Sequence, residues 1–232
     1  MTLTPLATRS LVAALLALLL AACGGEGDDH ATEVDVAALL LASADRMEEE
    51  PAFHFELEIE NGRVQIVRGI NIERAEGDIA AADRVHFLVE ARVGPLLAKI
   101  ELIVLPDEGW ITNPLTGRWE REDIDVAQFF DPADGITAVM RTITDAEIIG
   151  TESIAGIQTY RLESTVASDL LTLFGNPQSG VELQLRAWVG VEDPLVYRIE
   201  VVGGVMAREE DDLIRRLNLS QFGADFDIKP PR

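Results

Sequence analysis

The chain has 232 residues and a formal net charge of −22, because 41 residues are Asp or Glu and only 19 are Lys or Arg. This charge argues against nucleic acid as a partner and against adhesion to anionic lipid headgroups by overall charge, since phosphates are repelled. The single cysteine excludes a disulfide framework.

The first segment is typical of a bacterial export signal. Arg9 gives a positive start, Leu11–Leu20 form an apolar core, and small residues follow. The core is shorter than the roughly 20 apolar residues that a transmembrane helix needs. Leu20-Ala21-Ala22-Cys23 resembles the lipobox, in which the cysteine receives a diacylglyceryl group and the signal is cut before it. The sequence therefore predicts a signal peptide over residues 1–22 and a lipidation site at Cys23; the alternative is an ordinary secretory signal that contains a cysteine.

A flexible tether is predicted over residues 23–32, which are rich in glycine and aspartate and cannot bury apolar surface. The remaining residues, 33–232, are enough for one domain with a sizeable core. We expect acyl chains such as palmitate on Cys23 to anchor this exported domain to the outer face of the cytoplasmic membrane.

The folded part begins with a helix and continues mainly with strands. Asp35 can cap a helix that runs to about Glu50, where Pro51 stops it. From Phe53 to Glu60 apolar and polar residues alternate, which indicates a strand with one buried face. After the tight-turn signal Asn61-Gly62, further strands are predicted at Arg63–Arg74, Gly77–Ala81, Arg84–Val93 and Leu96–Leu105. In the last of these, both faces are apolar near Ile103 and Leu105, so part of the strand is expected to be covered on both sides.

The middle of the chain is predicted to be helical at Asp125–Phe130 and Ile136–Ile143, with the breaker Asp131–Gly135 between them. A short helix or lid is predicted at Asp169–Phe174. The later strands are predicted at Ala146–Ser153, Gln158–Val166, Val181–Val189, Leu195–Val202 and Leu213–Leu219. Short connections favour antiparallel neighbours, so the predicted fold class is α+β, a single domain built on a long antiparallel sheet.

The sequence contains no group of residues that is typical of a catalytic site. There is no Gly-x-Ser-x-Gly motif, and the chain has only three histidines. His54 and His86 lie in predicted strands near Glu56 and Glu90, and we interpret them as solvent-facing residues rather than bases or ligands. Asp131–Gly135 resembles the start of a calcium loop but lacks the later acidic ligands. The sequence therefore predicts no enzyme activity, no metal site and no cofactor.

Apolar surface is what the sequence offers instead. A curved sheet with helices on its concave side can enclose a ligand cavity. The alternative is that the same side chains interdigitate as a filled core. The predicted lining residues are Phe55, Leu57, Ile59, Phe87, Val89, Ile100, Leu102, Phe129, Phe130, Met140, Ile143, Leu171 and Phe174.

Four stretches of the sequence carry a family resemblance. They are WITNPLTGRWE at Trp110–Glu120, FFDPADGITAVM at Phe129–Met140, GTESIAGIQTYRLE at Gly150–Glu163 and LRAWVGVEDPLVYRIEV at Leu185–Val201. Together with the lipobox they resemble the LppX, LprA, LprF and LprG family of lipid-binding lipoproteins, best known from mycobacteria. These stretches mark structural features such as turns and strand boundaries rather than catalytic groups. No individual binding residue can therefore be transferred from the family.

The resemblance implies a half-barrel of antiparallel strands with helices on its concave side, related in shape to the periplasmic carriers LolA and LolB. It also implies an apolar cavity for multi-acyl lipids or glycolipids, which such proteins carry across the cell envelope, sometimes with a partner membrane transporter. We expect a monomer that binds no nucleic acid. Two other hypotheses remain at this point: a surface or envelope-assembly module with a filled core, and an exported hydrolase in which acids and His54 or His86 converge in a pocket.

Overall fold

The computed structural model describes residues 34–67, 70–81, 84–122, 132–171 and 177–232. Two units are distinguished, Met1–Val34 and Asp35–Arg232, and the second holds all the described helices and strands. The predicted signal peptide, the tether and Cys23 lie outside the described residues. Within the described parts, no helix is long and apolar enough to cross a bilayer.

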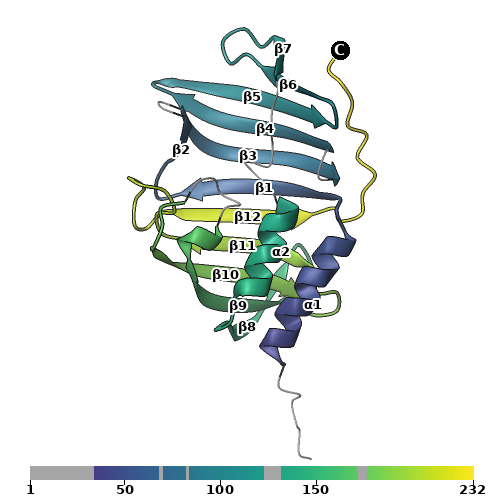
Figure 1. The fold of residues 1–232 in the computed structure, drawn as a ribbon, viewed down its shortest axis with the longest axis vertical. Coiled ribbons are helices and arrows are strands. Elements are labelled where there is room, and N and C mark those ends of the chain that lie inside the picture. The colour runs from purple at the N-terminus through teal and green to yellow at the C-terminus, as the bar shows by residue number, and fades with distance from the viewer. Residues whose placement is uncertain (1–33, 68–69, 82–83, 123–131, 172–176) are drawn as a thin grey trace, which may run out of the picture. The chain divides into compact units, whose positions relative to one another are not determined.

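The second unit is built on one antiparallel sheet of twelve strands (Figure 1). The strands are β1 (Phe53–Glu60), β2 (Val64–Val67), β3 (Ile70–Ala81), β4 (Arg84–Val93), β5 (Leu96–Leu105), β6 (Glu108–Thr112), β7 (Trp119–Glu122), β8 (Glu147–Ile154), β9 (Ile157–Ala167), β10 (Glu182–Gly190), β11 (Val196–Val202) and β12 (Ile214–Ser220). Their order is β7-β6-β5-β4-β3-β1-β12-β11-β10-β9-β8, and β2 pairs with β3 beside this path. Two meanders are therefore joined in the middle by β1 and β12, the first and last strands of the chain.

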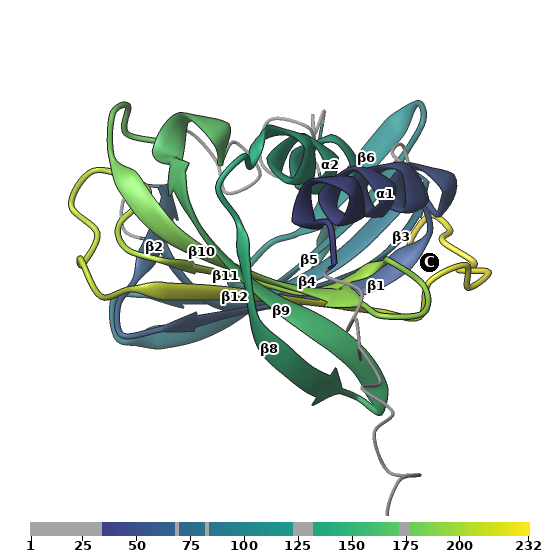
Figure 2. The ribbon, with the colours of Figure 1, turned by 90° about the horizontal axis from the view of Figure 1, so that it is seen from below.

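Two α-helices lie on one face of the curved sheet (Figure 2). They are α1 (Val36–Glu49) and α2 (Pro132–Thr142), and a short 3-10 helix, η2, spans Ser168–Leu170. The helices lie over β1 and β8–β12, whereas β3–β7 extend beyond them (Figure 1). This is the α+β half-barrel that the sequence and the resemblance predict.

Helix α1 begins where the sequence predicts, because the Asp35 side chain accepts a hydrogen bond from the Ala38 N–H at 3.1 Å. One face of the helix, at Leu40, Ala44 and Met47, is buried against the sheet. On its other side Arg46 Nε donates to Asp193 Oδ1 at 2.9 Å, which ties the helix to the turn between β10 and β11.

Three predicted boundaries are wrong. The expected breaker Asp131–Gly135 lies largely inside α2, which begins at Pro132. Proline is tolerated at the first position of a helix because the backbone N–H that it lacks would have no partner within the helix there. The two strands expected between Arg63 and Ala81 are instead β2 and one long β3. The hairpin of β6 and β7 was not predicted, although Asn113-Pro114 and Gly117 are turn residues. The helix expected at Asp125–Phe130 lies outside the described residues.

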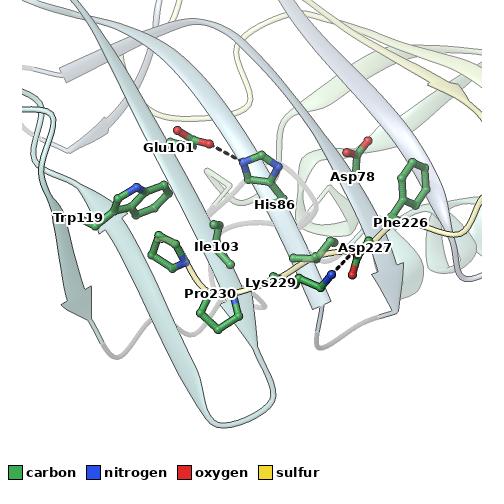
Figure 3. A pocket seen from close by; sticks show the side chains of 11 residues that line it. Asp78, His86, Glu101, Ile103, Trp119, Phe226, Asp227, Lys229 and Pro230 are labelled. Carbon is green, nitrogen blue, oxygen red and sulfur yellow. Dashed lines mark hydrogen bonds and ion pairs between the residues drawn. The ribbon is translucent and has the colours of Figure 1, made fainter.

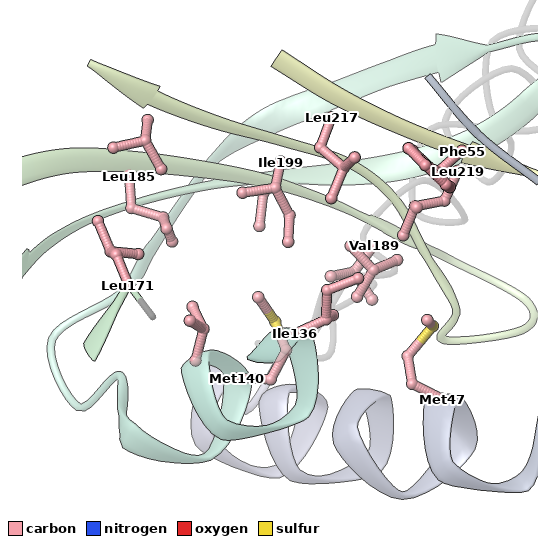
Figure 4. Close-up of a cluster of buried hydrophobic side chains, with 14 of the residues drawn as sticks. Met47, Phe55, Ile136, Met140, Leu171, Leu185, Val189, Ile199, Leu217 and Leu219 are labelled. Carbon is pink, nitrogen blue, oxygen red and sulfur yellow. The ribbon is translucent and has the colours of Figure 1, made fainter. Parts of the chain in front are cut away.

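The core fills the space between the helices and strands β1 and β9–β12 (Figure 4). Met47 from α1 and Ile136 and Met140 from α2 point toward Leu185, Ile199 and Leu217 of the sheet. All six side chains are 5% exposed or less, so this half of the concave face is packed solid.

Gly77 in β3 lies directly between Phe55 of β1 and Phe87 of β4 in the strand register. The two rings meet above it edge to face, with their centroids 5.0 Å apart. A Cβ on Gly77 would lie 2.3 Å from the His86 carbonyl oxygen and 2.7 Å from the Phe87 ring. Only glycine leaves room for this aromatic contact.

We therefore expect Gly77→Ala to lower the free energy of unfolding by about 1–3 kcal/mol, the usual cost of overpacking. Urea unfolding followed by tryptophan fluorescence measures it. Ala80→Val, which enlarges a neighbouring side chain on the other face of β3, is the matched control and should change stability little. Equal effects of the two substitutions would contradict the assigned role of Gly77.

Candidate functional site

The concave face of β3–β6 carries two rows of residues that cross the sheet. The strand register aligns Leu57, Ala75, Val89 and Ile100 in one row and Phe55, Gly77, Phe87, Leu102 and Ile111 in the next. The rows exist because each strand places alternate side chains on one face. They bring together predicted lining residues from three strands that are distant in sequence.

Exposure divides the predicted lining residues into two groups. Phe55, Phe87, Met140, Ile143 and Leu171 are buried in the core. The half-buried ones are Leu57, Ile59, Val89, Ile100 and Leu102. Phe129, Phe130 and Phe174 lie outside the described residues. The half-buried group occupies β1, β4 and β5, at and beyond the edge of the region that α1 and α2 cover in Figure 1.

Small side chains are concentrated on this same part of the concave face. Ala75 and Gly77 of β3, Ala91 of β4 and Ala98 of β5 face the same way as the two rows. On β9–β12 the corresponding positions carry larger residues such as Leu162, Leu185 and Leu217, which fill the space under the helices. The half-barrel is thus filled at one half and lined by small and half-exposed apolar groups at the other.

A cavity of about 550 Å³ opens at the end of the sheet where β1 turns into β2. Ile59 and Ile72 form its apolar wall, and Arg63, Asn71 and Arg92 supply polar groups. Ile59 is a predicted lining residue, but sequence patterns did not indicate the two arginines, because they become neighbours only when β2 and β3 pair.

The convex face of the sheet is a lattice of ion pairs. Arg216 of β12 bonds to Glu200 of β11 at 2.7 Å and to Glu60 of β1 at 2.5 Å. The hydrogen bond that Arg216 donates to Glu200 is the largest cause that raises the pKa of Arg216 above its ordinary value. Paired charges therefore cover much of this face, in contrast to the apolar rows on the concave face.

A second cavity, of about 360 Å³, lies on the convex face beneath the C-terminal segment 226–231 (Figure 3). His86 Nε2 lies 2.7 Å from Glu101 Oε1 at its wall, and Asp78, Ile103 and Trp119 also line it. Ile103 is only 7% exposed, so the convex side of β5 is covered at this point, whereas Leu102 and Val104 on the concave side are half-buried.

Acids and His86 do converge in this cavity, as the hydrolase hypothesis requires. Its lining, however, contains no serine, threonine or cysteine that could act as a nucleophile. The second histidine, His54, pairs with Asp78 through Nδ1 at 2.7 Å. Both pairs are cross-strand contacts of the outer face, and no group of three or more His, Cys, Asp or Glu suited to a metal ion occurs among the described residues.

An open antiparallel sheet, helices on its concave face and apolar rows beside them place the chain in the class of curved-sheet half-barrel proteins. More specifically, the chain belongs to the LppX_LprAFG lipoprotein family, whose model matches residues 35–220. The match begins at the N-cap of α1 and ends with β12, so it covers the whole described sheet.

Individual relatives agree with this assignment. The lipoarabinomannan carrier protein LprG of Mycolicibacterium smegmatis is 28% identical over 174 residues, which are 70% of this chain and 72% of that protein. The crystal structure of LprF from Mycobacterium bovis superposes with a TM-score of 0.65 at 14% identity, covering 84% of this chain and 96% of that one. LppX from Mycobacterium tuberculosis gives 0.61 at 16% identity, with 84% and 98% covered. The two structures establish the likeness of fold.

Proposed function

We propose that the protein binds multi-acyl lipids or glycolipids against the concave face of β3–β6 and carries them across the cell envelope. The observation that carries this proposal is the contrast within one face. Under the helices the sheet is packed solid, whereas Leu57, Val89, Ile100 and Leu102 keep accessible apolar surface beside small residues. An acyl chain laid along the two rows would remove that surface from water, at roughly 25 cal/mol per Å² buried.

The relatives support the same class of ligand. The name of the M. smegmatis protein describes a carrier of lipoarabinomannan, a glycolipid. We transfer to this chain only the chemical class of that ligand, a lipid with an apolar anchor and a polar head. The protein would recognise such a lipid by the shape of its apolar face rather than by individual polar residues.

Membrane attachment is proposed to come from acyl chains on Cys23, at about 0.8 kcal/mol per buried methylene. Two or three chains would hold the protein firmly at the outer face of the cytoplasmic membrane, whereas one would not. A monomer anchored in this way could take lipid from the outer leaflet and pass it to a receiver or accept it from a membrane transporter.

Native mass spectrometry is the first test. We expect the full chain, isolated from a bacterial envelope, to carry a noncovalent diacyl or larger lipid at close to one per protein, released by solvent extraction. Chain with Cys23→Ser, incubated with vesicles of phosphatidylglycerol, should gain the same type of mass, which separates bound lipid from covalent acyl chains.

A protein mass without bound lipid in both preparations, unchanged by the vesicles, would support the other hypothesis, a surface module with a filled core. That hypothesis has its own observation in its favour, the solid packing of Met140, Leu185 and Leu217 under the helices. The two functions are therefore distinguished by a single measurement of bound mass.

A further inference from the structure

Exposed leucines stand at two hairpin turns at the same end of the sheet. The turn between β4 and β5 presents Leu96 and Leu97, which are 59% and 54% exposed. The turn between β6 and β7 presents Leu115, which is 84% exposed. Because β4 and β6 run in the same direction, both turns point toward the end of the sheet at which β4 ends, although β6 stops opposite the middle of β5.

These turns are held in shape rather than collapsed onto the domain. Asn113 Oδ1 accepts hydrogen bonds from the Leu115 and Thr116 N–H groups at 3.0 and 3.1 Å. The Gly117 N–H donates to the Asn113 carbonyl oxygen at 2.8 Å, which closes the turn. The hairpin thus holds the Leu115 side chain in solvent. Exposing this apolar surface is unfavourable, and no contact of Leu115 in the described part of the chain offsets it.

The charge at these turns differs from that of the rest of the chain. Residues 91–100 contain Arg92 and Lys99 and no acid, and residues 109–119 contain Arg118 and no acid, in a chain with more than twice as many acids as bases. Arg92 pairs with Glu73, and Lys99 with Glu90 at 2.8 Å, so the two cations offset the nearest carboxylates. Lys99 lies two residues after Leu97, and Arg92 lies opposite Leu97 in the strand register. Arg118 is exposed beside Leu115.

The hairpin of β8 and β9 provides a contrast within the same sheet. It also exposes an isoleucine, Ile157, at 42%. Its neighbours are acidic, with Glu147 and Glu152 on β8 and no basic residue between Asp145 and Tyr160. An apolar tip with cations behind it therefore distinguishes the β4–β5 and β6–β7 turns, not hairpins of this protein in general.

From this juxtaposition we infer that the β4–β5 and β6–β7 turns dock the domain on the surface of a lipid bilayer. Leu96, Leu97 and Leu115 enter the boundary between headgroups and acyl chains, and Arg92, Lys99 and Arg118 remain at the level of the lipid phosphates. Arg92 and Lys99 offset Glu73 and Glu90, and Arg118 adds a further cation, so the local charge favours docking. The acids elsewhere in the chain do not oppose it, because the Debye length at physiological salt is only about 8 Å.

A bilayer fits these turns better than a protein groove does. The leucines project from two separate turns, which suits a soft surface that accommodates each tip separately. The docking end is also the end at which the 550 Å³ cavity opens, and Arg92 belongs to both. Docking there would bring Ile59 and Ile72 of the cavity wall to the membrane surface.

Site-specific depth measurements test this inference. In the full chain with Cys23→Ser, a single cysteine is introduced as Leu97→Cys, Leu115→Cys or, as the matched control, Ile157→Cys, and labelled with a nitrobenzoxadiazole probe. The chains are mixed with vesicles of phosphatidylcholine and phosphatidylglycerol whose acyl chains are brominated. All three share the same N-terminal segment, so differences between positions report which part of the domain meets the lipid.

We expect brominated lipid to quench most of the emission at positions 97 and 115 and little at 157. Replacing both Leu96 and Leu97 by serine should weaken the quenching at 115 by roughly tenfold or more in vesicle concentration. Lys99→Glu with Arg118→Glu should do the same on vesicles that contain phosphatidylglycerol, whereas Lys229→Glu, in the C-terminal segment, should not.

Equal quenching at the three positions, or none at 97 and 115, would overturn the inference. So would protection of position 97 from aqueous iodide without vesicles, accompanied by a dimer in sedimentation, because a second copy would then cover the turns. The outcome is independent of bound lipid in the concave face, since a domain with a filled core would still dock through these turns.

Discussion

Replacing Leu102 by tryptophan is expected to abolish lipid uptake while the domain stays folded. Leu102 lies on β5 in the row with Phe87 and Ile111, and its side chain is half-buried. The larger ring would occupy the space beside Val89 and Ile100 that we assign to an acyl chain. Uptake is measured as the mass of phosphatidylglycerol gained from vesicles in native mass spectrometry.

Thr165→Trp is the matched control for this experiment. Thr165 is exposed on the convex face of β9, so the same ring is added far from the two rows, and lipid uptake should remain. Unfolding by urea checks that both variants are folded. If Leu102→Trp takes up as much lipid as the unaltered chain, the lining proposed on β4 and β5 is wrong, whereas a loss with both variants would point to a global effect.

The second large effect is expected at the ion pair between Arg215 and Glu209. Arg215 projects from β12 toward the concave face, between Ile59 and Val201, and is only 1% exposed. Its guanidinium contacts the Glu209 carboxylate, whose other oxygen accepts a hydrogen bond from the Met206 N–H at 2.9 Å. Burial is the main cause that lowers the pKa of Arg215 below its ordinary value, and the hydrogen bond that Arg215 donates to Glu209 opposes it.

Glu209→Gln should lower the free energy of unfolding by about 3–5 kcal/mol, because the buried guanidinium loses the carboxylate that faces it. Urea unfolding of Glu209→Gln measures this loss, and a cycle of Glu209→Leu, Arg215→Met and the double variant with both substitutions gives the interaction energy. The double variant should recover much of the loss, since apolar pairs of similar volume replace buried ion pairs with little cost. A loss below about 1 kcal/mol would mean that the pair behaves like an exposed one.

Local sequence patterns were sufficient for the elements with strong periodicity. Alternation in Phe53–Glu60 and in Arg84–Val93 gave β1 and β4 with the correct buried faces, and Asp35 with Pro51 bounded α1 closely. The patterns failed where a residue type is compatible with two different local structures. Pro132 was interpreted as a breaker, yet proline also begins helices, and only the packing of Ile136 and Met140 on the sheet determines which applies.

The candidate site was predictable in part for the same reason. Alternation identifies which side chains share a face, so Leu57, Val89 and Leu102 were correctly placed together. It does not say where helices cover that face, and therefore could not separate the buried Met140 and Ile143 from the half-buried Ile100. Arg63 and Arg92 were missed because the cavity that they line depends on strand pairing between distant segments.

The pairing of β1 with β12 also has a consequence for how the protein is made. Leu57 and Leu217 are cross-strand neighbours although nearly the whole chain separates them, so the two meanders can join only after the last strand has been synthesised. Contacts of such high contact order form late and slowly. A chain of this design therefore stays without its closed sheet until its last strand has been added, so the two meanders remain separate throughout most of its synthesis.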